Sequence, residues 1–415
     1  MQMGRCTSMT EKDISALKGR RILLGVTGSI AAFKAADLAS KLAQAGAEVD
    51  CILTGSAERF VTALTFQALT GRRAYVDADL WSEEGHILHV GLAQTAELFV
   101  VAPATADSIA KMVHGRADTL LAITALAATC SKIVAPAMDA GMFEHPATQA
   151  NIARLRERGV MIVGPVEGRM ASGLIGLGRM AEPTDIVGTI RLAFGKNGPL
   201  AGRRIVVTAG GTQEPLDPVR VLANRSSGKQ GYAMAQAALD LGAEVTLISA
   251  PSHESTPTGA VRIEVRTASE MSLAVLEAVE DAHVLVMAAA VADFRPRSKS
   301  ERKIKRAGGV PELHLEPTDD ILAQVSSHRP EVVVGFAAES DDLVENATNK
   351  LKSKDLDLMV ANDITADDAG FAADTNRVTL ISASGGSEEL PLLAKTEVAE
   401  VVMERIVELL KQKSK

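Results

Sequence analysis

The sequence predicts an α/β protein made of two doubly wound, Rossmann-like domains with mainly parallel sheets. Three observations carry this prediction. Short apolar runs alternate with helix-length stretches along the chain, a pattern typical of parallel sheets covered by helices. The Gly-Arg-Arg-Ile sequence at 19–22 returns at 202–205, so a second βαβ unit begins there. The 415 residues also exceed the usual size of one hydrophobic core.

The elements of the first half follow in order. A strand is predicted within 19–28, where an apolar run meets a glycine turn. The helix after it places Leu38 and Leu42 on one face, and a second strand starts at Gly46. Further strands are predicted at 97–102, 132–135 and 160–163, and a closing helix at 184–194.

The second half repeats this order with one addition. Strands are predicted at 202–210 and from 242 to about 249, and then at 284–288, 332–336 and 356–360. The first two strand starts lie 27 residues apart in the first half and 40 in the second, so the second half carries thirteen extra residues. We expect this insertion to carry residues for the ligand-specific chemistry of the second half.

The domain limits follow from composition. Gly-Lys-Asn-Gly-Pro at 195–199 is typical of a connector. We therefore predict an N-terminal extension at 1–18, a first domain at 19–195, a linker at 196–201 and a second domain at 202–415.

Charge and cysteine content exclude several classes of protein. The net charge of −8 is spread over 52 acidic and 44 basic residues, which argues against a general nucleic-acid binder. Cys6, Cys51 and Cys130 form neither a metal-ligand spacing nor a disulfide framework. No run of eighteen apolar residues and no leader-like N-terminus occurs. A cytoplasmic protein that binds neither nucleic acid nor membrane is expected.

The turns after the predicted strands of the first half are rich in small and hydroxyl-bearing residues. Gly28 to Ala32 can offer backbone N–H groups at a helix start, and Thr54 to Ala57 and Pro103 to Asp107 form similar turns. The first turn lacks the G-x-G-x-x-G spacing of a dinucleotide site. Three such turns favour one phosphorylated planar cofactor.

Three motifs and one histidine of this half carry a family resemblance. Thr-Gly-Ser-Ile-Ala-Ala-Phe-Lys at 27–34, His89, Ala-Pro-Ala-Thr-Ala-Asp at 102–107 and Pro-Ala-Met at 136–138 resemble, in this order, the flavin-dependent cysteine decarboxylases. The resemblance implies an FMN site formed by Gly28, Ser29, Ile30, Thr54, Ser56, Pro103, Ala104 and Thr105. It also implies that His89 is catalytic and that Met142 and Arg179 contact the substrate.

Two residues depart from the family pattern. Ser172 stands where the family typically places a cysteine that donates a proton, and Asp139 where it has an asparagine. A serine hydroxyl is a poorer acid than a thiol. Ser172 and Asp139 are kept as catalytic candidates. The alternatives are an impaired or partial decarboxylase that releases the enethiol, and a flavin-binding domain without catalysis.

The insertion of the second half is dense in anion-binding groups. Its Ser-Ser-Gly-Lys at 226–229 lacks the first glycine of a Walker sequence. Together with Ala-Ala-Ala-Val-Ala-Asp-Phe at 288–294 and Lys-Ile-Lys at 303–305, it resembles the phosphopantothenoylcysteine synthetase domain over nearly all of 202–410. The whole chain thus resembles the bifunctional phosphopantothenoylcysteine decarboxylase and phosphopantothenate–cysteine ligase family of bacterial coenzyme A biosynthesis.

This resemblance implies a cytidylate-forming ligase whose substrates are 4'-phosphopantothenate, cysteine and CTP. It implies Asn224 and Lys303 as catalytic residues, Arg220 and Asn224 as substrate contacts, and Asp293 as a ligand of nucleotide or Mg²⁺. The implied nucleotide ligands are Asp293, Lys303, Thr318, Asp319, Asp320, Ile321, Phe336, Lys350 and Lys354. The stretch 295–306 carries seven basic residues and one acid, typical of a mobile loop that closes over phosphates.

The family further implies homo-oligomers, with trimers of the flavin domain and dimers of the synthetase domain. Two other functions agree with part of the pattern. An NAD-dependent dehydrogenase would explain two doubly wound halves, but neither first turn has the required glycine spacing. A flavin-binding regulatory protein would not need the synthetase motifs downstream.

Overall fold

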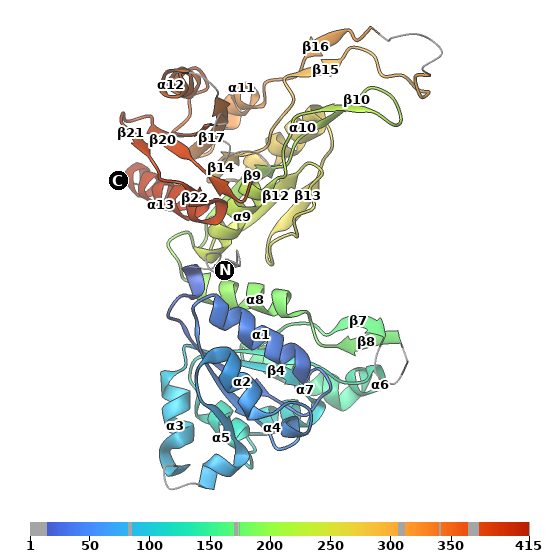
Figure 1. The fold of residues 1–415 in the computed structure, drawn as a ribbon, viewed down its shortest axis with the longest axis vertical. Helices are drawn as coiled ribbons and strands as arrows, with labels where there is room; N and C mark the ends of the chain where they lie inside the picture. Colours follow the sequence, from blue (N-terminus) through green and yellow to red (C-terminus); the bar gives the residue numbers. More distant parts are fainter. Residues whose placement is uncertain are drawn as a thin grey trace, which may run out of the picture. The chain divides into compact units, whose positions relative to one another are not determined.

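The computed structural model describes residues 15–81, 85–169, 173, 175–305, 312–339, 342–363 and 373–414. The chain divides into two compact units, Met1–Ala193 and Phe194–Lys415, and each is described by itself (Figure 1). The predicted linker at 196–201 begins a few residues after this division. Within the described residues, no helix has the length and apolar character to cross a membrane.

The first unit is built on a six-stranded parallel sheet in the order β3-β2-β1-β4-β5-β6. Its strands are β1 (Arg21–Val26), β2 (Glu48–Leu53), β3 (Ala74–Val76), β4 (Leu98–Ala104), β5 (Ser131–Pro136) and β6 (Met161–Ile162). The central β4 is buried along its whole length, as a strand covered by helices on both faces requires. β7 (Val166–Arg169) and β8 (Ile175–Arg179) form a separate antiparallel pair.

Helices cover both faces of this sheet. The helices are α1 (Ala32–Gln44), α2 (Ala63–Thr70), α3 (Gly85–Thr95), α4 (Ala106–His114), α5 (Leu120–Ala127), α6 (Ala140–Glu144), α7 (Pro146–Glu157) and α8 (Pro183–Gly195), with short 3₁₀ turns η1 (Ser15–Leu17), η2 (Ala57–Arg59) and η3 (Asp77–Trp81). α1 buries Leu38 and Leu42 together, as their spacing predicts, and packs on β1, β2 and β4. Apolar side chains of α3, α4, α5 and α7 form a core with the strands that includes Phe99, Ile109 and Leu121.

The second unit is built on an eight-stranded sheet in the order β13-β12-β9-β14-β17-β18-β20-β21. Its strands are β9 (Arg204–Ala209), β12 (Glu244–Ser249), β13 (Val261–Glu264), β14 (Val284–Met287), β17 (Val332–Glu339), β18 (Leu358–Asp363), β20 (Val378–Ser382) and β21 (Ser387–Glu389). The pairs from β13 to β18 are parallel, and β20 and β21 continue the sheet antiparallel. The order reverses between β9 and β14, where a doubly wound sheet binds ligands.

The helices of this unit are α9 (Lys229–Asp240), α10 (Ala268–Val279), α11 (Ile321–Val325), α12 (Leu343–Ser353) and α13 (Lys395–Lys413), with η5 at Ser326–His328. α9 and α13 pack against one another. α10, α11 and α12 form a core with the strands that includes Met271, Leu285, Leu351 and Met359.

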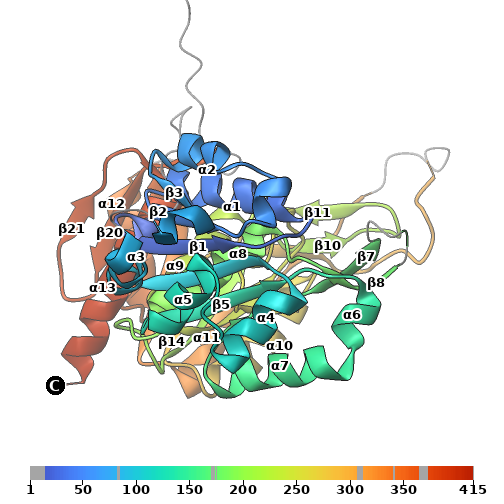
Figure 2. The ribbon, with the colours of Figure 1, turned by 90° about the horizontal axis from the view of Figure 1, so that it is seen from below.

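Three small antiparallel pairs lie outside the main sheet. They are β10 (Gln213–Pro215) with β11 (Val221–Ala223), β15 (Phe294–Pro296) with β16 (Leu315–Pro317), and β19 (Thr375–Asn376) with β22 (Leu393–Ala394). The first two pairs lie next to one another and extend from the unit (Figure 1, Figure 2). The thirteen extra residues of the second half thus belong to a region that folds as the β10–β11 hairpin.

The predicted fold class is confirmed, while several predicted element limits were wrong. The strand expected at 356–360 starts at Leu358, because the N–H of Leu356 donates to Leu351 O and closes helix α12. The strand expected at 160–163 is Met161–Ile162, because the N–H of Val160 caps α7 through Leu155 O. The stretch 295–306, expected to be a mobile loop, begins inside strand β15, and its last residue, Arg306, lies outside the described residues.

Candidate functional site

The first candidate site lies at the carboxyl ends of β1, β2 and β4, where the hydroxyl-rich turns meet. A Cβ atom on Gly28 would lie 2.4 Å from Cβ of Ser56, so the turns after β1 and β2 touch where only glycine fits. Gly28 and Ser56, both predicted from sequence, are therefore neighbours.

Thr27 fixes the turn after β1 against the turn after β4. Its buried hydroxyl donates to Pro103 O at 2.7 Å and accepts from the N–H of Thr105 at 3.0 Å. Sequence reasoning missed Thr27 as a positioning residue. A hydroxyl at the last buried position before a glycine turn is the signal that points to it.

The three predicted hydroxyls each organise their own turn. Ser29 Oγ accepts from Ala31 N, Thr54 Oγ1 from Ala57 N, and Thr105 Oγ1 from Ser108 N, which caps α4. Each hydroxyl keeps its own proton or further lone pairs for a ligand. Among the other predicted residues, Pro103 and Ala104 are buried and Ile30 is 60% exposed.

His89 lies on α3, which packs against α5 and η3. Its Nδ1 atom is buried and has no hydrogen-bond partner among the described residues. A buried ring nitrogen without a partner is costly unless a ligand or substrate completes it. This observation distinguishes His89 from an ordinary capping histidine.

The predicted substrate contacts gather around α6 and β8. Asp139 caps α6 by accepting from the N–H of Gly141 at 3.2 Å, and Met142 on the same helix is half-exposed. The N–H of Met138 donates to Gly178 O, which joins this turn to β8. Arg179 at the end of β8 lies 3.5 Å from Glu182. Ser172 lies outside the described residues.

These residues fit a flavin phosphate and ring. The tight contact of the turns after β1 and β2 lets backbone come close to a ligand, and the hydroxyls and the first turns of α1 and α4 suit an anion. The exposed Ile30 at the turn after β1 offers an apolar contact.

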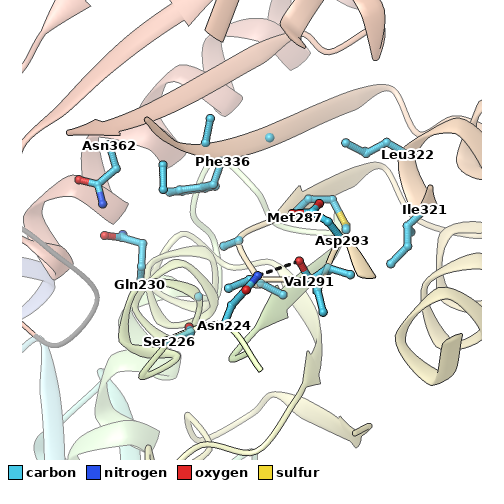
Figure 3. A pocket seen from close by; sticks show the side chains of 18 of the residues that line it. Asn224, Ser226, Gln230, Met287, Val291, Asp293, Ile321, Leu322, Phe336 and Asn362 are labelled. Atoms are coloured by element: carbon cyan, nitrogen blue, oxygen red, sulfur yellow. Dashed lines mark hydrogen bonds between the residues drawn. The ribbon is translucent and has the colours of Figure 1, made fainter. Parts of the chain in front are cut away.

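The second candidate site is a cavity of about 750 Å³ at the reversal of strand order in the second unit (Figure 3). The structure brings together most of the predicted ligase residues in its lining. They are Asn224, Asp293, Thr318, Asp319, Asp320, Ile321, Phe336, Lys350 and Lys354. They come from the turn after β11, the turns after β14 and β16, the start of α11, strand β17 and the carboxyl end of α12.

The turn after β14 is held in place by side chains of neighbouring segments. Thr208 and Thr212, both fully buried, accept from the N–H groups of Ala289 and Ala292. On the other side, Asn224 Nδ2 donates to Val291 O at 3.1 Å, as Figure 3 shows, and Thr318 Oγ1 donates to Ala292 O. Thr208 and Thr212 were not predicted from the sequence as positioning residues.

Asp320 and Lys354, two predicted nucleotide ligands, form an ion pair with one another. Burial raises the pKa of Asp320, but the Lys354 hydrogen bond and the backbone N–H of Ala323 outweigh this and hold that pKa below its usual value. Asp320 also caps helix α11. The Asp320 carboxylate is therefore ionised and is paired with the Lys354 ammonium group.

Arg220 and Lys303 do not belong to the lining of this cavity. Arg220 Nη1 donates to Ile304 O at 3.0 Å and to Asp217 Oδ2 at 2.8 Å, and Ile304 N donates to the same carboxylate at 3.1 Å. Buried Asp217 thus ties the β10–β11 hairpin to the segment that carries Lys303, whose own side chain is exposed. The role of Asp217 was not predicted from the sequence.

No group of three or more side chains from His, Cys, Asp and Glu forms a metal cluster within the described parts of the chain. Asp293, the predicted metal ligand, lies exposed in the cavity lining with Asp319 and Asp320.

Comparisons with known proteins identify both units. Residues 11–194 match the model of the family described as Flavoprotein, and residues 200–410 match the one described as DNA/pantothenate metabolism flavoprotein C-terminal domain. The chain is therefore a flavoprotein joined to a domain of pantothenate metabolism.

Relatives extend over nearly the whole chain. It is 44% identical over 400 residues to the coenzyme A biosynthesis bifunctional protein CoaBC of Bacillus subtilis (strain 168), covering 95% of this chain and 98% of that protein. It is also 42% identical to a cysteine/cysteine sulfinic acid decarboxylase of an unknown prokaryotic organism, covering 84% of this chain and 99% of that protein. A crystal structure of the C-terminal domain of CoaBC is 38% identical with a TM-score of 0.45, covering 52% of this chain and 99% of that chain. The chain belongs to the family of coenzyme A biosynthesis bifunctional proteins.

Proposed function

We propose that this protein joins cysteine to 4'-phosphopantothenate with CTP and then decarboxylates the product on FMN to give 4'-phosphopantetheine. The observation that carries the proposal is the gathering of nine ligase-type residues around one cavity, in a chain whose first half is a flavoprotein. The two activities match the bifunctional name of its relatives.

The ligase step needs an activated carboxyl group. A carboxylate oxygen of phosphopantothenate attacks the α-phosphorus of CTP, an acyl cytidylate forms and pyrophosphate leaves. The cysteine amine then attacks the acyl carbon, the C–N bond forms, CMP leaves and the amine loses a proton. Lys350 and Lys354 would hold the triphosphate, and Phe336 would pack against the base.

Asn224 has the geometry of a positioning and polarising group. Its Nδ2 donates to Val291 O, so its Oδ1 points elsewhere and the amide holds the turn after β14 in place. Triphosphate binding would draw Lys354 from Asp320, which would leave that carboxylate, with Asp293, to share Mg²⁺ with the phosphates. Lys303 would reach the phosphates only if its segment closes over the cavity.

In the first unit the turns after β1, β2 and β4 would hold FMN through Ser29, Thr54 and Thr105. When bound, FMN supplies the two-electron oxidation of the substrate thiol that lets the sulfur accept the electrons left by departing CO₂. His89 would contact the reacting end of the substrate, and Arg179 and the α6 turn with Asp139 and Met142 would hold its other groups. Ser172 or another group would donate the proton of the last step.

We further infer a cytoplasmic homo-oligomer, with flavin-domain trimers and synthetase-domain dimers. The cysteine usage of the sequence supports the compartment. Exposed apolar side chains on the two hairpins of the second unit, Val221, Phe294 and Leu315, support association of that unit.

The test is to incubate the FMN-loaded protein with 4'-phosphopantothenate, cysteine, CTP and Mg²⁺ and to follow products by mass spectrometry. 4'-Phosphopantetheine is expected. Accumulation of the cysteine adduct without CO₂ loss would restrict the function to ligation, and no adduct would refute the proposal. Free cysteine as sole substrate is the control, because one relative is named for its decarboxylation.

A further inference from the structure

Lys34 is a buried lysine at an unfavourable place in a helix. It is the third residue of α1, shortly after the turn predicted to hold the flavin phosphate, and it is only 8% exposed. Burial costs a cation its hydration, and the first turn of a helix is the positive end of the helix dipole. The interactions of the Lys34 ammonium group must therefore offset the cost of keeping a charge there.

The ammonium group of Lys34 joins α1 to the segment that follows β8. Its Nζ donates to Met180 O at 3.1 Å and to Glu182 Oε1 at 2.7 Å. The same oxygen of Glu182 lies 3.5 Å from Nη2 of Arg179, the predicted substrate contact. One carboxylate thus pairs with two cations, and the buried Lys34 is the nearer of the two.

Arg179 is confined from another side by Gly168 of β7. A Cβ atom on Gly168 would lie 2.6 Å from Cδ of Arg179 and 2.9 Å from its Nη1, so the Arg179 side chain crosses the strand where only glycine leaves it room. The N–H of Met138 donates to Gly178 O, which joins this part of β8 to the turn that carries Asp139. Arg179 therefore has a defined place next to the other predicted substrate contacts.

The two ion pairs of Glu182 differ in strength. The side chains of Glu182 and Arg179 are both about half-exposed, so water screens their attraction, whereas the Lys34 side chain is buried and lies closer. Lys34 is therefore the main counterion of Glu182, and Arg179 keeps its charge available for another anion. Without Lys34, the Glu182 carboxylate would pair with Arg179 instead and would also repel an anionic ligand.

We propose that Lys34 and Gly168 are positioning residues of the flavin unit, which hold Arg179 in place for an anionic group of the substrate. This inference rests on the proposed decarboxylase function, whose substrate carries a carboxylate and a phosphate. Lys34 acts through Glu182, and Gly168 acts by leaving room for the Arg179 side chain. A lysine so close to a phosphate-binding turn suggests a ligand of the flavin phosphate, but the contacts of Lys34 assign it to the substrate side.

The test is the release of CO₂ from 4'-phosphopantothenoylcysteine by the full-length, FMN-loaded protein. For Lys34→Met and for Gly168→Ala we expect KM to rise about tenfold, while the flavin absorbance per chain stays at the wild-type value. Alanine fits the backbone of Gly168, which has no positive φ, so this variant displaces Arg179 without altering Lys34. Combining Lys34→Met with Glu182→Gln removes the competing carboxylate and should return KM to within a few-fold of wild type.

Lys41→Met is the matched control, because Lys41 lies on the same helix and forms a surface ion pair with Asp37. Its KM should equal that of the wild type. Pantothenoylcysteine, which lacks the phosphate, identifies the anion that Arg179 binds. With this substrate the KM difference between wild type and Lys34→Met disappears if the anion is the phosphate, and it persists if the anion is the carboxylate.

Three results would overturn the inference. Loss of flavin from Lys34→Met would assign the lysine to the flavin phosphate. A wild-type KM in both single variants would remove the link to Arg179, and a double variant as impaired as Lys34→Met would exclude the role of Glu182. A wild-type protein that releases no CO₂ would instead refute the decarboxylase function, and the inference would fall with it.

Discussion

Single residues decide how closely the loops of both sites approach one another. Gly28 is the clearest case, because its missing Cβ lets the turns after β1 and β2 touch. Thr27 then fixes the same turn to Pro103 and Thr105. In the second unit Thr208 and Thr212 have the same role for the turn after β14. Positioning hydroxyls next to glycine turns are therefore common to the two sites.

Gly28→Ala is expected to abolish or greatly reduce FMN binding, because the new methyl group would lie 2.4 Å from Ser56 Cβ and push the two turns apart. The flavin absorbance per purified chain measures this. Gly28→Ala combined with Ser56→Gly should recover part of the flavin. Gly91→Ala on α3, where a Cβ meets nothing within 4 Å, is the control. Full flavin content in the single variant would contradict the assignment of this turn.

Lys354→Met is expected to raise KM for CTP about tenfold while KM for cysteine changes little, because a phosphate contact is lost. Steady-state kinetics with each substrate varied in turn measures this. The same variant removes the cation that depresses the pKa of Asp320, so that pKa should move up toward its usual value. A rise confined to KM for cysteine would contradict the nucleotide assignment.

Elements show how far the sequence alone could lead. Strand β14 is a continuous apolar run and β9 contains one at 205–207, so their places could be predicted from residues alone. The hairpins β10–β11 and β15–β16 have three-residue strands of mixed exposure, and a strand of three residues is too short to show a burial pattern in the sequence. Asp217 joins the β10–β11 hairpin to the segment that carries Lys303 by accepting a hydrogen bond from Ile304 N. These two residues are 87 positions apart in the sequence, so no local sequence pattern could predict their contact.

Asp217→Asn is expected to loosen this anchor and lower the melting temperature of the second unit by a few degrees at neutral pH. Burial opposes ionisation of Asp217, yet the backbone N–H groups of Val219, Ile304 and Arg220 and the Arg220 charge lower its pKa overall. A carboxylate with a lowered folded pKa stabilises above its unfolded pKa, near 4, and loses this effect as pH falls through the folded value. The difference between wild type and variant should therefore shrink on acidification, as thermal unfolding between pH 7 and pH 3 can show. A difference in melting temperature that does not change with pH would contradict this role of the Asp217 carboxylate.

At the scale of the whole molecule, each unit has its own core and its own ligand cavity or cradle. The residues predicted as a linker are packed rather than open. A Cβ on Gly198 would meet Leu241 O at 2.3 Å, and Leu200 N donates to Leu241 O. These contacts hold residues 195–201 against the end of α9. The glycine and proline content of the segment gives no indication of this packing.

A fragment of residues 194–415 is accordingly expected to melt several degrees above one of residues 202–415, because the shorter fragment leaves the end of α9 uncovered. Differential scanning fluorimetry of the two fragments measures this. Equal melting temperatures would show that the segment is a free connector, as its composition predicts. Pyrophosphate exchange by both fragments checks that each retains the ligase cavity.

The last strands of the eight-stranded sheet bear on how the protein behaves at high concentration. A sheet that ends in an unpaired backbone can recruit a strand from another molecule, which is the first step of fibre growth. Here the final strand β21 is only Ser387–Glu389, and its glutamates are exposed, with Glu388 held by Arg405. A short edge that carries negative charge repels its own copies. The antiparallel strands β20 and β21 thus cover the edge of the long parallel strands and disfavour aggregation by strand addition at that edge.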